Sequence, residues 1–270
     1  MSTTTSNMNK AFPLLAKQVK LDSISYGSLK TSDNGSKSVY VSHAGSTLVI
    51  QTPKMLTTFA LSKYNADKDV EVAPDVIEKF NLQLSLRNMD TNKGMSNFHN
   101  MLRGLDAIFI ADGVENSKQW FKKSYAAEVL SELYSSPITF PKDKETGEIT
   151  DKFPPTFRIT VPVKNGKIIC DCVDENDVKL DLNTIERGTQ VTAILQCTGL
   201  WLAGSKFGCS WKVLKLQVIE QSNALKNFAF RDDADADDAD ADATVDKKSK
   251  FIESSDDEND AAVDDDDDDE

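Results

Sequence analysis

The sequence has few of the side chains that build active sites, metal centres and disulfide scaffolds. Among 270 residues there are two histidines and four cysteines. Neither histidine lies at the spacing of a metal motif or a nucleophile elbow, so we expect no enzyme and no bound cofactor or metal. We interpret the cysteines as buried thiols. The alternative is a zinc site of Cys170, Cys172, Cys197 and Cys209, whose spacing departs from that of paired zinc knuckles.

Long apolar runs are also absent. No stretch of eighteen apolar residues occurs, and the first ten residues lack the charged-then-apolar order of a secretory signal. We therefore expect an intracellular protein, without a signal peptide, a transmembrane segment or a membrane partner.

Negative charge is abundant but unevenly placed. The chain carries 31 Lys and Arg against 44 Asp and Glu, a net charge of −13. Residues 232–270 hold 20 acids and 3 bases (3 − 20 = −17), and residues 1–231 hold 28 bases and 24 acids (28 − 24 = +4). Like charges repel, and this acidic tail has almost nothing to bury, so we expect it to be disordered.

Alternating apolar and polar residues predict β-strands through most of the body. Helical spacing occurs only in the middle, where it predicts one helix capped by Ser96 and a second over residues 117–134. The order of strands, helices and strands indicates a mainly antiparallel β domain with an α insertion. The predicted strands cover residues 38–45, 46–53, 79–86, 156–163, 166–173, 189–202 and 207–219.

The predicted domains follow from these patterns. We expect an N-terminal extension (1–36), a β domain (37–230) with a helical insertion at about 95–134, and a disordered acidic C-terminal tail (231–270). The segment 135–157 contains Pro154 and Pro155, which exclude a central strand, and we expect a long hairpin or flexible arm there.

Acidic residues are missing from two windows of the body, residues 34–66 and 188–219. A groove for single-stranded nucleic acid needs cations for the phosphates and flat side chains for the bases, away from carboxylates. Because 26 of the 31 bases are lysine, which lacks the planar fork that reads guanine, we expect binding without sequence reading. The windows contain Lys37, Tyr40, Lys54, Phe59, Lys63 and Tyr64, and Trp201, Lys206, Phe207, Trp211, Lys212 and Lys215.

The aromatic residues have core packing as their alternative, and we rank it ahead of stacking. On the last strand we place Trp211 on a mixed row with Phe207 and Lys215, opposite an apolar row of leucine and valine. Trp201 alternates with apolar residues and belongs to the core unless a bulge at Gly199 turns it outward. Lys122 and Lys123 either extend a phosphate track or are solvated lysines of a helix face.

Several segments together resemble the single-stranded DNA-binding proteins of large DNA viruses, distant relatives of the short-tailed coliphage single-stranded DNA-binding protein. The resemblance covers roughly residues 37–219, and the last hairpin is its most specific part. The segments are KSVYV (37–41), IQTPKM (50–55), ENSKQWFKKSY (115–125), KDKETGEITDKFPPTF (142–157) and QCTGLWLAGSKFGCSWKVLKLQV (196–218).

This resemblance implies an OB-fold with helical insertions that coats single strands during viral DNA replication, recombination and repair, in the host cytoplasm or nucleus. It also implies that the acidic tail occupies the DNA groove when DNA is absent and contacts replication proteins such as DNA polymerase. A homodimer is compatible with the sequence. The candidate DNA-binding residues are Lys37, Tyr40, Lys54, Lys63, Lys122, Lys123, Lys152, Arg158, Lys206, Phe207, Trp211, Lys212 and Lys215.

The acidic tail also supports two rival functions. Acidic tracts behind a β-rich body are typical of histone chaperones, whose carboxylates shield basic partners without any DNA groove. Under that hypothesis removal of the tail abolishes the activity, whereas for a DNA-binding protein it enhances binding. A structural virion protein would show neither activity.

Overall fold

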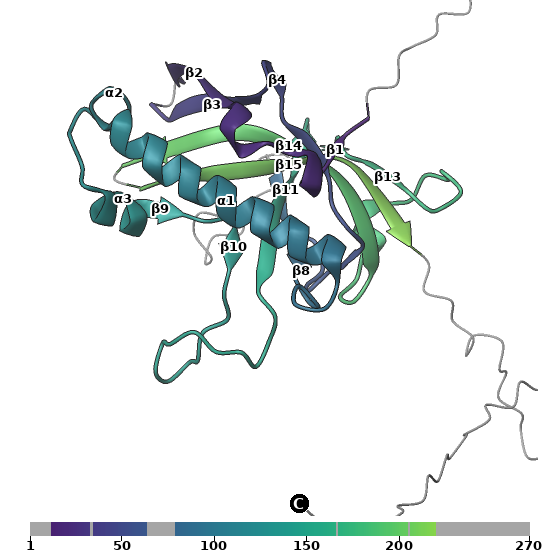
Figure 1. Ribbon diagram of the computed structural model, residues 1–270. Helices are drawn as coiled ribbons and strands as arrows, with labels where there is room; N and C mark the ends of the chain where they lie inside the picture. Colours follow the sequence, from purple (N-terminus) through teal and green to yellow (C-terminus); the bar gives the residue numbers. More distant parts are fainter. Residues whose placement is uncertain (1–11, 33–34, 64–78, 166, 205, 220–270) are drawn as a thin grey trace, which may run out of the picture. The chain divides into compact units, whose positions relative to one another are not determined.

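The computed structural model describes residues 12–32, 35–63, 79–165, 167–204 and 206–219 (Figure 1). The predicted disorder of the acidic tail concerns residues outside these segments. No helix within them is both long and apolar enough to cross a membrane.

Strands dominate the described residues, and the prediction of a mainly β fold with inserted helices is confirmed. The sheet is mixed, because β15 pairs antiparallel with β14 but parallel with β9, β11 and β13. The strands are β1 (Leu14–Leu15), β2 (Ile24–Thr31), β3 (Lys37–His43), β4 (Ser46–Thr47), β5 (Val49–Gln51), β6 (Met55–Leu56), β7 (Ser62–Lys63), β8 (Lys79–Ser85), β9 (Tyr134–Ser135), β10 (Ile138–Thr139), β11 (Thr156–Lys164), β12 (Lys167–Ile168), β13 (Asp171–Val173), β14 (Gln190–Ala203) and β15 (Lys206–Ile219).

The sheet closes on itself to form a barrel. Its central strands run in the order β14, β15, β11, β8. At the far side, β6 pairs with the beginning of β14, and Thr57, directly after β6, forms a bridge with Leu84 of β8. The Thr58 amide donates to the carbonyl of Gln83 at 3.0 Å, which continues this seam. The ring β14–β15–β11–β8–β6–β14 is thereby complete, as in small barrels whose interior is filled with side chains.

Apolar residues alternate into the barrel interior and are buried there, as the period of a strand requires. In β14 this alternation changes phase at a bulge around Gly199, whose φ is +110°. A Cβ at this position would collide with the carbonyl oxygen of Val39, so glycine is required both by conformation and by space. Leu200 and Leu202 then point inward and Trp201 turns to the half-buried side, so the exception that the sequence left open, a bulge at Gly199, is the one that occurs.

Helix α1 (Lys93–Glu115) packs its apolar side against the barrel. It begins one turn earlier than predicted, because the Asn92 side chain accepts a hydrogen bond from the Met95 amide at 3.0 Å and caps the helix before Ser96. The ring of Phe98 meets that of Phe157 on β11 at 5.5 Å between centroids.

The prediction of one continuous helix over residues 117–134 is wrong. Two short helices occur instead, α2 (Ser117–Phe121) and α3 (Ala127–Leu133), because Lys122 adopts a left-handed conformation with φ 64°. The break lets Phe121 pack edge-on against both Tyr125 and Phe207.

The first described residues form part of the same sheet. Strand β1 pairs with β5, and β2 pairs along β3. Two short 3-10 turns, η1 (Ala16–Gln18) and η2 (Leu21–Ser23), connect β1 to β2. The Leu21 side chain packs against α1 at Gly104, where a larger residue would clash with it.

Candidate nucleic-acid interface

The outer side of the barrel carries a continuous row of polar and basic residues. Across the strands, Gln196 lies opposite Lys212, Lys212 opposite Thr160, and Thr160 opposite Asn81. Exposed Arg158 lies opposite Gln83 one row away. We call one group of outward residues on these strands the barrel face: Lys79, Asn81, Gln83, Arg158, Thr160, Gln196, Thr198, Ser210 and Lys212.

The strands that build the barrel face contain no acidic residue. Strands β8, β11, β14 and β15 include six basic residues and neither Asp nor Glu. A shallow hollow of about 270 Å³ lies on this face, between Lys79, Thr160, Thr198 and Lys212. Positive charge on strands that carry no carboxylate of their own attracts phosphate, and hydroxyl and amide groups can donate hydrogen bonds to it.

Two of the predicted stacking residues are in the core. Phe207 is 0% and Trp211 is 2% exposed, so neither offers a ring face to a base, and both follow the core-packing alternative that was ranked ahead of stacking. The Trp211 ring packs edge-on against Phe157 at 6.2 Å, and Phe207 packs against Tyr134 at 5.1 Å. Trp211 is nevertheless one of the residues that line the hollow.

A different aromatic residue lies beside the barrel face. Phe59 is 59% exposed. It follows Thr58, which is hydrogen-bonded to Gln83 of β8, and precedes Ser62, which lies opposite Asn81 of the same strand. Phe59 is thus held next to the β8 edge, where its ring is accessible. The lysine-and-aromatic window 34–66 contained this residue, although it was not among the candidates.

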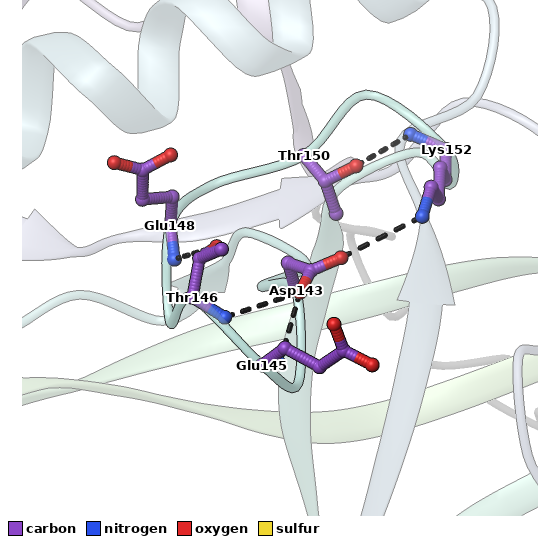
Figure 2. A network of polar contacts seen from close by, with 6 residues as sticks. All are labelled: Asp143, Glu145, Thr146, Glu148, Thr150 and Lys152. Atoms are coloured by element: carbon purple, nitrogen blue, oxygen red, sulfur yellow. Dashed lines mark hydrogen bonds and ion pairs between the residues drawn. The ribbon is translucent and has the colours of Figure 1, made fainter.

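Two of the predicted lysines form ion pairs with carboxylates of the same chain. Lys215 Nζ lies 2.8 Å from Asp177 Oδ1, and this hydrogen bond raises the pKa of Lys215. Lys152 Nζ lies 3.5 Å from Asp143 Oδ2 in the arm between β10 and β11 (Figure 2). The amides of Glu145 and Thr146 also donate to Asp143, and they lower its pKa.

The arm projects away from the barrel, as Figure 1 shows. A bridge between Lys142 and Ile149 closes its tip into a turn, in agreement with the predicted hairpin. The Lys152 ion pair belongs to this turn and not to the barrel face.

Four other predicted residues gather near the β14–β15 turn. Lys206 lies opposite Ala203, and Lys37 lies opposite Leu202. Lys37 and Phe121 line one hollow of about 380 Å³, and Lys122 and Lys123 directly follow Phe121. Tyr40, on the same strand as Lys37, is 39% exposed and its hydroxyl is hydrogen-bonded to Thr47.

The last two predicted lysines are Lys54 and Lys63. Lys54 lies apart from both the barrel face and the β14–β15 turn, and the side chain of Lys63 is outside the described residues. Lys54 lines two adjoining hollows with Lys17, Arg87 and Lys93, none of which was predicted. Lys79 of the barrel face was also missed. The sequence held a usable signal for two of them, because residues 79–89 form a further acid-free run that includes Lys79 and Arg87.

Three further ionisable residues lie within the fold, outside the barrel face. Buried Asp106 of α1 accepts hydrogen bonds from the hydroxyls of Tyr134 and Ser136, both at 2.6 Å, and burial raises its pKa. His43 Nε2 accepts the Lys20 amide at 3.1 Å. Burial lowers the pKa of His99.

The cysteines also pack within the fold. The Sγ atoms of buried Cys197 and Cys209 lie 3.5 Å apart. Cys172 is buried as well, as predicted, whereas Cys170 is half-buried. In the described part of the chain, no three Cys, His, Asp or Glu residues are grouped as metal ligands would be.

Solved structures of two phage proteins are similar to this chain. One is gp2.5, a single-stranded DNA-binding protein encoded by bacteriophage T7, with 12% identity over 68% of this chain and 98% of that chain and a TM-score of 0.41. Another is the single-stranded DNA-binding protein from bacteriophage Enc34 in complex with single-stranded DNA, with 9% identity over 72% of this chain and 95% of that chain and a TM-score of 0.40.

Sequence comparison gives the family. No curated protein matches the chain. The model of one protein family, described as "Family of unknown function (DUF5871)", matches residues 84–232, which include α1, the arm and β11 to β15. The match spans more than half of the residues of this chain, and the chain therefore belongs to this family.

Proposed function

We propose that this protein binds single-stranded DNA without reading its sequence, through the barrel face. The observation that carries the proposal is the absence of acidic residues from β8, β11, β14 and β15, whose outer side presents Lys79, Arg158 and Lys212. Cations placed there release the counterions of phosphate and gain affinity from that release. A carboxylate among them would cancel much of this gain.

The chemistry of the face favours backbone contact over base reading. Two of its three cations are lysines, which act as point charges, and its polar residues are threonine, serine, asparagine and glutamine. Phe59 supplies an exposed ring for one base, and stacking on it is tolerant of sequence. We assign to Phe59 the stacking role that the sequence suggested for Trp211 and Phe207.

The acidic tail acts as an intramolecular competitor in this proposal. A segment with a net charge of −17, joined to a body of +4, is present at high effective concentration near any cationic surface of the same chain. A long single strand displaces it, whereas weak contacts do not. By resemblance, the released tail binds replication proteins such as DNA polymerase, and the protein serves viral DNA replication, recombination or repair.

The first test is titration of a labelled oligothymidine strand with the full chain and with a chain ending at Arg231. We expect both to bind, the shortened chain more tightly, with the difference shrinking as salt rises. Equal affinity of the two chains at low salt would refute competition by the tail. Absence of binding by both would refute the function itself. Histone binding that requires residues 232–270 would instead favour the chaperone alternative.

The second test addresses the face. The triple variant Lys79→Gln, Arg158→Gln and Lys212→Gln should reduce the slope of log affinity against log salt by about 2, at about 0.7 for each lost phosphate contact. The control replaces Lys144, Lys167 and Lys179 with glutamine; these exposed lysines are not part of the barrel face, and the control should retain the wild-type slope. Phe59→Ala should cost about 1–3 kcal/mol of binding, compared with a negligible loss for exposed Phe153→Ala in the arm.

A further inference from the structure

A second cationic surface lies at the other end of β14. Lys17, Lys54 and Lys93 line a hollow of about 670 Å³. A neighbouring hollow of about 370 Å³ shares Pro53 and Lys54 with it and adds Arg87. We call the two together the end groove. Among the described residues no Asp or Glu lines either part, and Asp90, close to Arg87 in sequence, is not a lining residue.

The four cations of the end groove come from separate segments of the chain. Lys17 belongs to η1, Lys54 precedes β6, Arg87 follows β8, and Lys93 begins α1. All four are exposed, and none forms an ion pair with another described residue. The fold has therefore brought together positive charges that the sequence keeps apart, and it gives them no carboxylate partner among the described residues. This differs from Lys152 and Lys215, each of which has one.

The end groove and the barrel face lie along the same side of one strand. The outward residues of β14 alternate from Gln190 to Thr198. Gln190 and Thr192 line the end groove, and Thr198 lines the hollow of the barrel face. With a rise of about 3.3 Å per residue, the eight steps from Gln190 to Thr198 span roughly 25 Å. Half-buried Ile194 and Gln196 lie between them on the same side.

The lining of the end groove indicates which part of a nucleic acid it takes. The residues described there include no aromatic ring, so they offer no platform for a base. Its polar groups are amides and hydroxyls, including those of Gln51, Asn97 and Gln217. Lysine ammonium groups beside neutral donors suit phosphate oxygens.

We propose that the end groove binds the phosphate backbone of the same single strand that occupies the barrel face, and that it is engaged only when the strand is long enough to extend along β14. This inference rests on the proposed function. It adds Lys17, Lys54, Arg87 and Lys93 to the DNA contacts of the barrel face. The bound strand then follows a path along β14, from the barrel face to the end groove. Affinity then rises in a second step as the strand lengthens.

A length series tests the inference. The full chain and the triple variant Lys17→Gln, Lys54→Gln and Lys93→Gln are titrated with oligothymidines from about 4 to about 20 nucleotides, which bracket the site sizes of single OB-folds. We expect equal affinity for the shortest strand that binds. For the longest strand the variant should bind about tenfold more weakly, with a salt slope smaller by about 2. The Lys144, Lys167 and Lys179 control should follow the wild type at every length.

The outcomes separate this inference from the proposed function. If the wild type binds no oligothymidine, the function itself fails. If the wild type binds and the variant equals it at every length, the end groove is not a DNA contact. If the variant loses the same factor at every length, the end groove belongs to the primary site and the two-step path is wrong. Should the triple variant melt below the wild type, Lys54→Gln alone must still reduce the long-strand slope, by about 0.7.

Discussion

Lys212 and Lys215 lie on the same side of β15, yet they belong to two regions of opposite character. Lys212 is on the barrel face, opposite Thr160 and Gln196. Lys215 lies against β13 and the loop that follows it, where Asp177 holds its ammonium group at 2.8 Å and Asp171 is its neighbour across the strands.

The difference shows that the surroundings of a lysine decide what it can bind. A phosphate approaching Lys215 must displace a carboxylate and is repelled by a second one, whereas at Lys212 it meets hydroxyl and amide groups. Composition alone treats the two lysines as equal. Substitutions at four places test this difference. They are the core residue Trp211 below the barrel face, the two lysines, the carboxylate of Asp177, and Asp143 in the arm.

The largest expected effect concerns Trp211, the inward neighbour of Lys212. Trp211→Ala should lower the free energy of unfolding by about 3–5 kcal/mol, because it empties a core position that packs against Phe157. Urea denaturation measures this loss, with half-buried Trp201→Ala as the milder control. A folded Trp211 variant with unchanged stability but weakened DNA binding would return the residue to the interface.

The next effect separates the two lysines. Lys212→Glu places a carboxylate on the acid-free face and should weaken oligothymidine binding at low salt by about tenfold, or ~1.4 kcal/mol. Lys215→Glu changes a lysine that is already paired and should weaken binding much less. Fluorescence anisotropy with both variants decides the matter, and equal losses would contradict the distinction between the two regions.

A smaller effect is expected when the partner of Lys215 is removed. In Asp177→Asn the pKa of Lys215 should fall toward its ordinary value, because the hydrogen bond to the carboxylate is what raises it. The freed lysine should steepen the salt dependence of DNA binding by at most about 0.7, the value of one contact. Glu175→Gln, in the same loop, is the control and should leave the slope unchanged. A shallower slope in Asp177→Asn would show that Asp177 itself assists binding.

The smallest effect is confined to the arm. The folded-state pKa of Asp143 lies below the unfolded value of about 3.9. Its stabilisation of the turn is therefore present above that value and is lost as the pH falls through the folded-state pKa. In NMR spectra, the amide signals of Glu145 and Thr146 should shift in that range, while that of Thr160 on the barrel face stays in place. Asp143→Asn should remove the pH dependence, and its persistence would assign it to another carboxyl group.

Most of the fold follows from local patterns. Alternation located the long strands, and apolar spacing located α1, because both depend on residues a few positions apart. The faces of β15 were assigned wrongly. A register shift opposite Ile194 and Leu195 places Val213 and Leu216 inward and leaves Leu214 half-buried, so counting by twos from Leu216 put Trp211 on the wrong side. The break at Lys122 was missed because the contact that accompanies it, Phe121 against Phe207, joins residues far apart in the sequence.

The site was less accessible from the sequence. The acid-free windows pointed to Lys212 and to Phe59, since the absence of carboxylates is a property of a continuous segment. The pairing of Lys215 with Asp177 joins residues 38 positions apart and needs the β13–β15 contact. The end groove likewise depends on four segments that only the closed barrel brings together.

The bulge at Gly199 also shapes how β14 tolerates substitution. Before it, the odd-numbered positions from Val191 to Cys197 require small or apolar side chains, and after it the even-numbered positions Leu200 and Leu202 do. A saturation mutagenesis profile of this strand should therefore oscillate with a period of two and invert its phase at Gly199. The bulge at this one glycine thus determines which positions of the strand tolerate polar residues: the even-numbered ones before it and the odd-numbered ones after it.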